Sequence, residues 1–248
     1  MRTSNPVFGN RFQRYAQAGY GAGQEAMTVE GTATKTAILL LCVLIGGVIV
    51  WYFFAAGNYG LVYSLMLIGL IGGFVVALIT MFKPTWAAVT SPAYGVLEGL
   101  ILGGISAIFE LAYPGIMFQA VALTFGVFAL VLVLYRFRIL RATPRFAKGI
   151  IAATGAIMIV YIVGIILSLF GVNVVFFSLS SNPISIGFSV LVVAIAALNF
   201  VLDFGFIEEG ANQGAPKHME WYAAFGLLVT LVWLYLEILR LLAKLRSR

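Results

Sequence analysis

The uncharged stretch Ala37–Ala55, AILLLCVLIGGVIVWYFFA, decides the fold of this chain. A helix needs about 20 mostly apolar residues to cross the hydrocarbon core of a bilayer. This run meets that length, and it begins too late and is too long for a secretory signal peptide. We therefore expect it to be the first of several membrane-spanning helices.

Six further windows have the same length and apolar character, and all seven prolines lie in the N-terminal segment, in connections or at span starts. Proline disrupts a helix interior, so this placement favours helices. Strands of a membrane barrel would be about 10 residues long and alternate in polarity. The sequence thus predicts an all-α, polytopic membrane protein with seven transmembrane helices. The six further windows are Leu61–Met81, Pro92–Tyr113, Gly115–Tyr135, Phe146–Phe170, Ile184–Ile207 and Trp221–Leu242.

The composition excludes several other classes of protein. Of the 248 residues, 62% are hydrophobic and 10% are charged, whereas a soluble domain carries roughly 25% charged residues. One cysteine, Cys42, excludes a disulfide scaffold. The net charge of +6 comes from basic residues beside apolar spans, which indicates topology signals and anionic-lipid contacts. We expect a lipid bilayer, not a nucleic acid, as the main partner.

The basic residues also predict the orientation. The sequence divides into a flexible polar N-terminal tail (1–35), a membrane domain (36–243) and a basic C-terminal tail (244–248). Through the sixth span, eleven Lys or Arg fall on one side and none on the other, which places the N-terminus in the cytoplasm. The last span leaves two alternatives. It crosses fully and carries its basic end outside, or it re-enters and returns inside.

Charged residues inside the spans are the candidate functional groups, because burying a charge in hydrocarbon costs about 2.5–3.5 kcal/mol. Glu98 and Asp203 have no cation three or four residues away. Each is therefore expected to face a partner helix, the bundle interior or water, and Asn199 shares the helix face of Asp203. Since burial changes the protonation of a carboxyl group, these two acids make a proton-sensitive switch plausible.

The remaining polar and small residues fit functional and structural interpretations alike. Glu237 and Arg240 form either a local ion pair or part of a polar core, while Glu208 fits an ordinary interfacial position. Small residues recur every four positions around Glu98, and such a stripe lets a neighbouring helix approach closely. The residues of this stripe are Gly95, Gly99, Gly103 and Ala107.

Four segments of the chain resemble the Bax inhibitor-1 family. Leu198-Asn199-x-x-x-Asp203 is similar to a signature of its sixth helix, and the ending Leu239-Arg240-Leu241-Leu242 resembles the close of its seventh. Glu98-Gly99 fits a polar-glycine position near the start of its third helix, and the opening Met1–Val7 is similar to that of bacterial members. The resemblance covers roughly residues 30–245.

The resemblance implies a seven-helix fold with the last helix central, and a pH-sensitive calcium leak sensed by two aspartates on the sixth and seventh helices. Asp203 fits the first aspartate. Counting back from Arg240 puts Thr230 at the second position, so this chain departs from the pattern. Glu237 or Glu208 could substitute for the missing acid.

The leading functional interpretation is a cation leak of the plasma membrane, with calcium or protons as the ions and the interior carboxylates as its gate. The alternative is a non-conducting protein that binds another membrane protein, since the family's bacterial members include a modulator of a membrane-bound protease. We expect no enzymatic activity, because no nucleophile–base pair is visible, and no cofactor beyond a transported calcium ion. The sequence does not identify a set of metal ligands.

Overall fold

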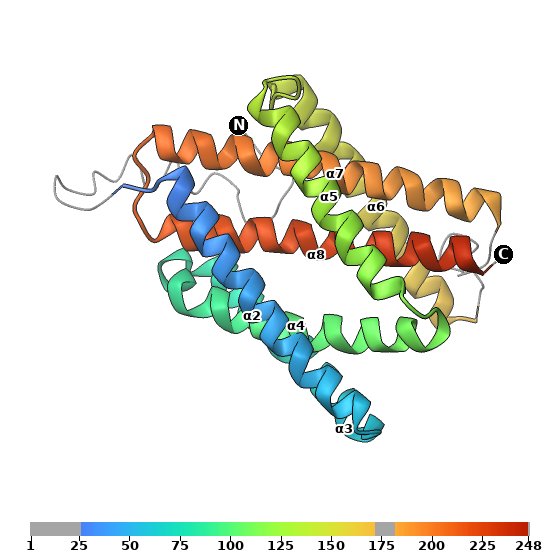
Figure 1. The fold of residues 1–248 in the computed structure, drawn as a ribbon. Helices are drawn as coiled ribbons and strands as arrows, with labels where there is room; N and C mark the ends of the chain where they lie inside the picture. Colours follow the sequence, from blue (N-terminus) through green and yellow to red (C-terminus); the bar gives the residue numbers. More distant parts are fainter. Residues whose placement is uncertain (1–25, 172–181, 248) are drawn as a thin grey trace. The chain divides into compact units, whose positions relative to one another are not determined.

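The computed structural model describes residues 26–171 and 182–247, and these are almost entirely helical (Figure 1). Within this part of the chain, the only extended pairing is a bridge between Ala26 and Pro216. Seven helices are long and apolar enough to cross a membrane, which confirms the predicted fold class. In order, the elements are α2 (Val29–Ala55), α3 (Tyr59–Phe82), the short η1 (Pro84–Trp86), α4 (Ala87–Ala112), α5 (Ile116–Arg136), α6 (Pro144–Leu169), α7 (Pro183–Asn212) and α8 (Met219–Arg246).

Several helix ends differ from the predicted boundaries. α2 begins at Val29 because the Thr28 side chain caps it, accepting a hydrogen bond from the Gly31 amide. Helical structure thus extends into the segment assigned to the N-terminal tail, whose residues 1–25 lie outside the described part. At the other end of the chain, α8 continues to Arg246, past the predicted start of the C-terminal tail.

The prediction that every proline lies outside a helix interior is wrong for Pro92. Pro92 occupies the sixth position of α4, which begins at Ala87. The start is earlier because Pro84 opens η1, and Ala87 already has right-handed helical backbone angles. The turn before Pro92 is therefore continuous with the helix, although proline removes one of its hydrogen bonds.

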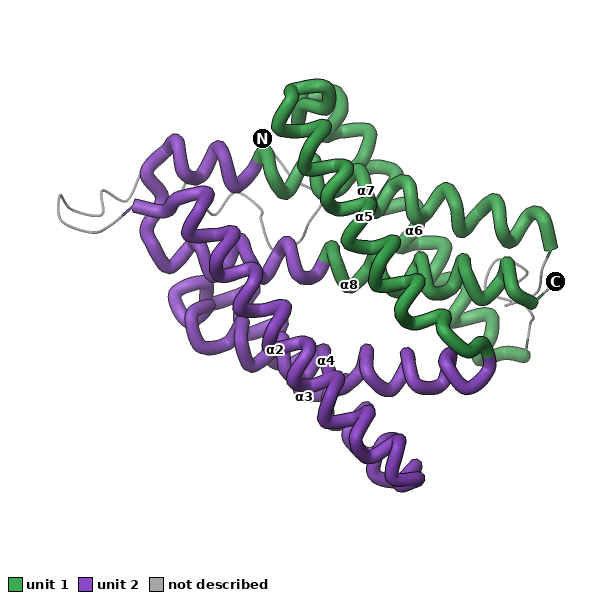
Figure 2. Tube along the Cα trace, in the orientation of Figure 1, with its two compact units in different colours: residues 1–5, 113–205, 230–248 green, residues 6–112, 206–229 purple. Residues whose placement is uncertain are grey.

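The chain forms two compact units (Figure 2). Unit 1 contains Tyr113–Gly205 and Thr230–Arg248, which include α5, α6, most of α7 and the C-terminal part of α8. Among the described residues, unit 2 comprises 26–112 and Phe206–Val229, which include α2, α3, α4, the end of α7 and the start of α8. Each unit is described by itself below.

The small-residue stripe of α4 packs against α2 in unit 2. A side chain at Gly99 would meet the backbone carbonyl of Val43 and the Cα of Gly46, and one at Gly103 would lie 2.9 Å from the Cα of Gly47. Gly95 faces the Leu39 carbonyl in the same way. These glycines therefore allow backbone-to-backbone contact of the two helices.

Replacing Gly99 by alanine should lower the free energy of unfolding by about 1–3 kcal/mol, because the new methyl group meets fixed backbone atoms of α2. Gly155→Ala is the matched control: nothing lies within 4 Å of a side chain there, so it should be neutral or stabilise α6 by about 0.5–1 kcal/mol. Unfolding in mixed micelles measures both. Equal effects of the two substitutions would contradict close packing at Gly99.

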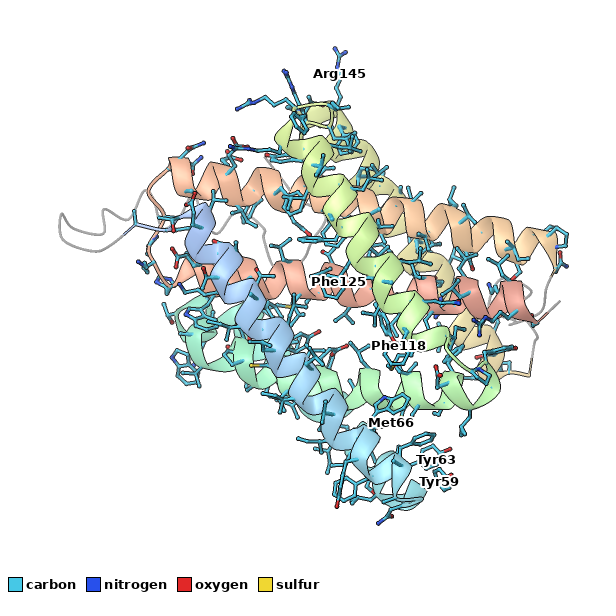
Figure 3. The ribbon with its side chains drawn as sticks, viewed as in Figure 1. Tyr59, Tyr63, Met66, Phe118, Phe125 and Arg145 are labelled. Carbon is cyan, nitrogen blue, oxygen red and sulfur yellow. The ribbon has the colours of Figure 1, made fainter. Side chains whose placement is uncertain are left out.

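Large apolar side chains cover the outer surface of several helices. Phe118 and Phe125 project from α5, and Tyr59 and Tyr63 from the start of α3 (Figure 3). All four are exposed, Phe118 to 71%. Soluble proteins rarely expose large contiguous apolar patches, so these faces fit contact with lipid.

The two ends of α8 favour the crossing alternative for the last span. In unit 2 it begins beside the start of α2, where Glu220 binds Thr28. In unit 1 its end meets the uncharged α4–α5 connection, where Arg246 donates to the carbonyl oxygens of Tyr113 (3.3 Å) and Pro114 (2.8 Å). Its 28 residues extend about 42 Å as a continuous helix, which is long enough to cross the hydrocarbon core of a bilayer.

Candidate functional site

Asp203 forms the centre of the candidate site in unit 1. It lies on α7, is only 1% exposed, and its Oδ2 accepts a hydrogen bond of 2.6 Å from the Thr230 hydroxyl on α8. Thr230 is thus the residue that faces Asp203, at the position where the family pattern has a second aspartate. A neutral donor therefore contacts Asp203 where a second carboxylate was expected.

Asn199 lies one turn before Asp203 on α7 and extends the polar site toward α6. Its amide Nδ2 donates to the Thr154 hydroxyl at 2.9 Å and to the Ile195 carbonyl at 2.8 Å. Asn199 is 5% exposed. Three helices thus contribute oxygen-bearing side chains to the neighbourhood of one buried carboxylate.

Aromatic rings flank Asp203 along α7. Phe200 and Phe204 pack edge-on against Phe128 of α5, with ring centroids 5.1 and 5.7 Å away. Such contacts stabilise a fixed helix arrangement. They hold the segment of α7 that carries Asp203 against α5.

A second polar cluster in unit 1 is built on Glu237, which is 2% exposed on α8. Its Oε1 accepts hydrogen bonds from the Tyr161 hydroxyl of α6 (2.6 Å) and from Arg240 Nη1 (2.9 Å). Arg240 also donates to the Tyr161 oxygen at 2.8 Å. Glu237 and Arg240 are therefore both an ion pair on one helix and part of a polar core with α6.

Lys244, one turn beyond Arg240, was not selected from the sequence. It is fully buried, and its ammonium group donates to the Ser189 hydroxyl at 3.0 Å and the Ser185 carbonyl at 3.3 Å. Together with the bonds of Arg240 and Arg246, this contact explains how the basic end of α8 is accommodated. Three of its cations make internal hydrogen bonds.

Glu98 belongs to unit 2, so the structure does not place it in the same unit as Asp203. It is partly buried on α4, hydrogen-bonds Tyr94 one turn earlier, and lies beside Gly73 of α3. Tyr94 in turn packs edge-on against Phe225 of α8, with centroids 4.9 Å apart. Within unit 2, Glu98 therefore faces the contact of α4 with α3.

Glu220 is the fully buried acid of unit 2, and sequence reasoning missed it. It pairs with Lys35 of α2, and its Oε1 accepts hydrogen bonds from the Thr28 amide (2.9 Å) and hydroxyl (3.0 Å). A side chain at Gly31 would collide with its carboxylate. The signal in the sequence was an acid in the first turn of a helix, which is usually an exposed position.

The titratable residues near the α7–α8 connection include Glu208, Glu209 and His218. Glu208 is partly buried in unit 2, and Glu209 accepts a hydrogen bond from Gln213. Burial lowers the pKa of the His218 imidazole in the connection itself. Among residues 26–171 and 182–247, no three His, Cys, Asp or Glu side chains could together hold a metal ion.

The fold and its lipid-facing surfaces define a multi-pass helical membrane protein with buried carboxylates. The chain belongs to the Bax inhibitor 1 like family, whose model matches residues 5–247. This match confirms the family inferred from the sequence motifs. Comparison with curated proteins and with solved structures finds no match.

Proposed function

We propose that this protein is a cation leak of the plasma membrane, with calcium among the transported ions and Asp203 as the acid that controls passage. The carrying observation is the bond between Asp203 and Thr230, which joins α7 to α8 through a carboxylate that is 1% exposed. A carboxylate is costly to bury in a membrane helix, and such residues commonly mark ion or proton pathways. Calcium also prefers oxygen ligands, which Asp203, Thr230, Asn199 and Thr154 supply.

The Asp203–Thr230 pair supports a simpler response to pH than two carboxylates would give. Two acids at hydrogen-bond distance share one proton and repel each other when it is lost. A threonine hydroxyl is neutral at every physiological pH, and it can donate to a carboxylate or accept from a carboxylic acid. The Asp203–Thr230 contact therefore contains one titratable group, whereas two carboxylates at the same positions would titrate as a coupled pair.

Replacing Asp203 by asparagine tests the proposed role directly. We expect the ratio of calcium fluxes at roughly pH 8 and pH 6 to fall to about one, because the amide does not titrate in this range. The measurement is calcium entry into liposomes that contain the purified protein and an enclosed indicator. An unchanged pH profile in Asp203→Asn would contradict the proposal.

His218→Gln is the matched control for this measurement. An imidazole has an ordinary pKa near neutral, and burial lowers the pKa of His218. This side chain lies in the α7–α8 connection, outside both helices. The control should therefore keep the flux ratio of the unsubstituted protein. Loss of pH dependence in His218→Gln, with retention in Asp203→Asn, would assign the response to the connection.

The proposal makes the protein a transport protein without catalytic residues or a resident cofactor. Its site consists of carboxylate, amide and hydroxyl groups held by helix-to-helix hydrogen bonds. Glu237, Arg240 and Tyr161 form the next polar layer along α8, about two turns after Thr230. They would stabilise the helix arrangement around the pathway.

A further inference from the structure

Lys244 is a buried cation near the end of α8 that has no part in the proposed control by Asp203. It is fully buried, and its ammonium group donates to the Ser189 hydroxyl at 3.0 Å and to the Ser185 carbonyl at 3.3 Å. A charge within a membrane-spanning helix is costly, and such residues commonly mark ion pathways. Since apolar side chains can often replace buried charges without loss of stability, packing alone does not account for this ammonium group.

Lys244 lies on the same face of α8 as Thr230 and Glu237, because the three residues follow one another at intervals of seven, close to two helical turns. Thr230 binds Asp203 of α7. Fourteen residues further along α8, Lys244 binds Ser189, which lies equally far from Asp203 along α7. The two helices are therefore antiparallel in register, and their polar contacts extend over about 21 Å of this face of α8. All of these residues lie in unit 1 (Figure 2).

The charge along this face changes sign between its two ends. The acids of unit 1 among the described residues are Asp203 and Glu237. Asp203 lies opposite Thr230, and Glu237 pairs with Arg240 at 2.9 Å. Lys244 follows one turn later, and its charged neighbours include Arg240 and Glu237. A cation that moves along this face would meet a carboxylate at Asp203 and an ammonium group at Lys244.

A positive charge beside a pathway opposes cations in proportion to their own charge. The energy of repulsion doubles from a monovalent to a divalent cation, and a rate depends exponentially on its barrier. The factor by which a positive charge slows a divalent cation is therefore the square of its factor for a monovalent one. Arginine side chains exclude cations from water-conducting pores by the same repulsion.

We propose that Lys244 is a selectivity residue, which slows divalent cations more than monovalent ones along the α7–α8 face; this inference rests on the cation leak proposed above. Asp203 attracts cations, and Lys244 limits their passage at the other end of the polar face. The arrangement suits a slow leak and not a rapidly conducting channel. If Lys244 served only to join α8 to α7, its hydrogen bonds would matter and its charge would not affect selectivity.

The test measures the entry of calcium and of potassium into liposomes that contain the purified full-length protein and an enclosed indicator for each ion. Lys244→Gln removes the charge but keeps an amide that can donate to the Ser189 hydroxyl. We expect it to raise potassium entry about threefold and calcium entry about tenfold, so that the ratio of calcium to potassium entry rises about threefold. Lys244→Arg keeps the charge and should keep the ratio of the unsubstituted protein.

Lys244→Met separates the charge from the hydrogen bonds, because it removes both. If the charge sets the selectivity, the methionine and glutamine variants should show the same increase in the ratio. If only the methionine variant differs from the unsubstituted protein, the hydrogen bonds to α7 are responsible and the proposal is wrong.

Arg246→Gln is the matched control, since it removes one positive charge from an exposed position two residues further along α8. Water and salt screen an exposed charge, so the ratio should change by less than about twofold. An equal increase in Arg246→Gln and Lys244→Gln would mean that net charge, and not the buried position of Lys244, governs the ratio.

The same measurement distinguishes this inference from the proposed leak. Calcium entry with a ratio that Lys244→Gln leaves unchanged would overturn the selectivity role alone. Calcium entry without potassium entry would do the same, because a positive barrier favours the ion of lower charge. If neither ion enters faster than into protein-free liposomes, the proposed leak is wrong and this inference is overturned with it.

Discussion

Replacing Lys35 by methionine should lower the free energy of unfolding by about 3–5 kcal/mol, because it leaves a buried carboxylate without its cation. Glu220 is fully buried, whereas the Lys35 side chain is 17% exposed. Removing Lys35 therefore leaves the Glu220 carboxylate buried without a neighbouring positive charge and without access to water. The Thr28 amide and hydroxyl would still bind Glu220, but they do not supply a positive charge.

The opposite substitution, Glu220→Gln, should cost less, about 1–2 kcal/mol. The glutamine oxygen can still accept the hydrogen bonds of Thr28, and Lys35 can extend toward water from the start of α2. The double variant should recover part of the loss caused by Lys35→Met, since it contains no stranded carboxylate. Unfolding in mixed micelles gives all three values and their coupling energy.

Lys148→Met provides the control, since this lysine is exposed on α6. Its substitution should change the free energy of unfolding by no more than about 0.5 kcal/mol. The decisive result is the difference in unfolding free energy between Lys35→Met and Glu220→Gln. If Glu220→Gln destabilised the protein more than Lys35→Met, burial of the carboxylate would not govern the pair.

The seven-helix fold could be predicted because lipid contact demands long apolar runs, and these are visible in the sequence. The helix ends could not be predicted as well. α2 begins at Val29 within a polar stretch, since Thr28 caps it and Lys35 pairs with Glu220 on α8. A polar helical residue such as Lys35 can pair with a residue far away in the sequence. Hydropathy alone does not reveal such a pairing, so the polar start of α2 was predicted to belong to the N-terminal tail.

The same reasoning separates the predicted and the missed site residues. Asp203 was predicted as a site residue because no cation lies close enough in the sequence to pair with it. Counting back from Arg240 selected Thr230, whose hydroxyl lies 2.6 Å from Asp203 Oδ2. Glu220 and Lys244 stand near helix ends, where charged residues are usually solvated. Their partners are 185 and 55 residues away, so no local pattern reveals their burial.

Replacing Thr230 by aspartate should make calcium flux steeply dependent on pH. The new carboxylate would replace a hydroxyl that is 2.6 Å from Asp203 Oδ2, and both positions are at most 5% exposed. Two acids this close share one proton, and its loss places two negative charges in contact. Their repulsion, about 4 kcal/mol at 4 Å with an effective dielectric constant of 20, would force α7 and α8 apart.

The expected result for Thr230→Asp is a flux at roughly pH 8 at least about tenfold above that at pH 6, because repulsion opens the contact only after the shared proton is lost. Thr230→Val is the matched control, since it keeps the shape of the side chain and removes the donor. It should destabilise the protein by about 1–3 kcal/mol without adding pH dependence, because the buried carboxylate of Asp203 loses one hydrogen-bond donor. Calcium entry into liposomes over a pH series measures both variants. A Thr230→Asp profile identical to that of the unsubstituted protein would show that the α7–α8 contact at Asp203 does not limit the flux.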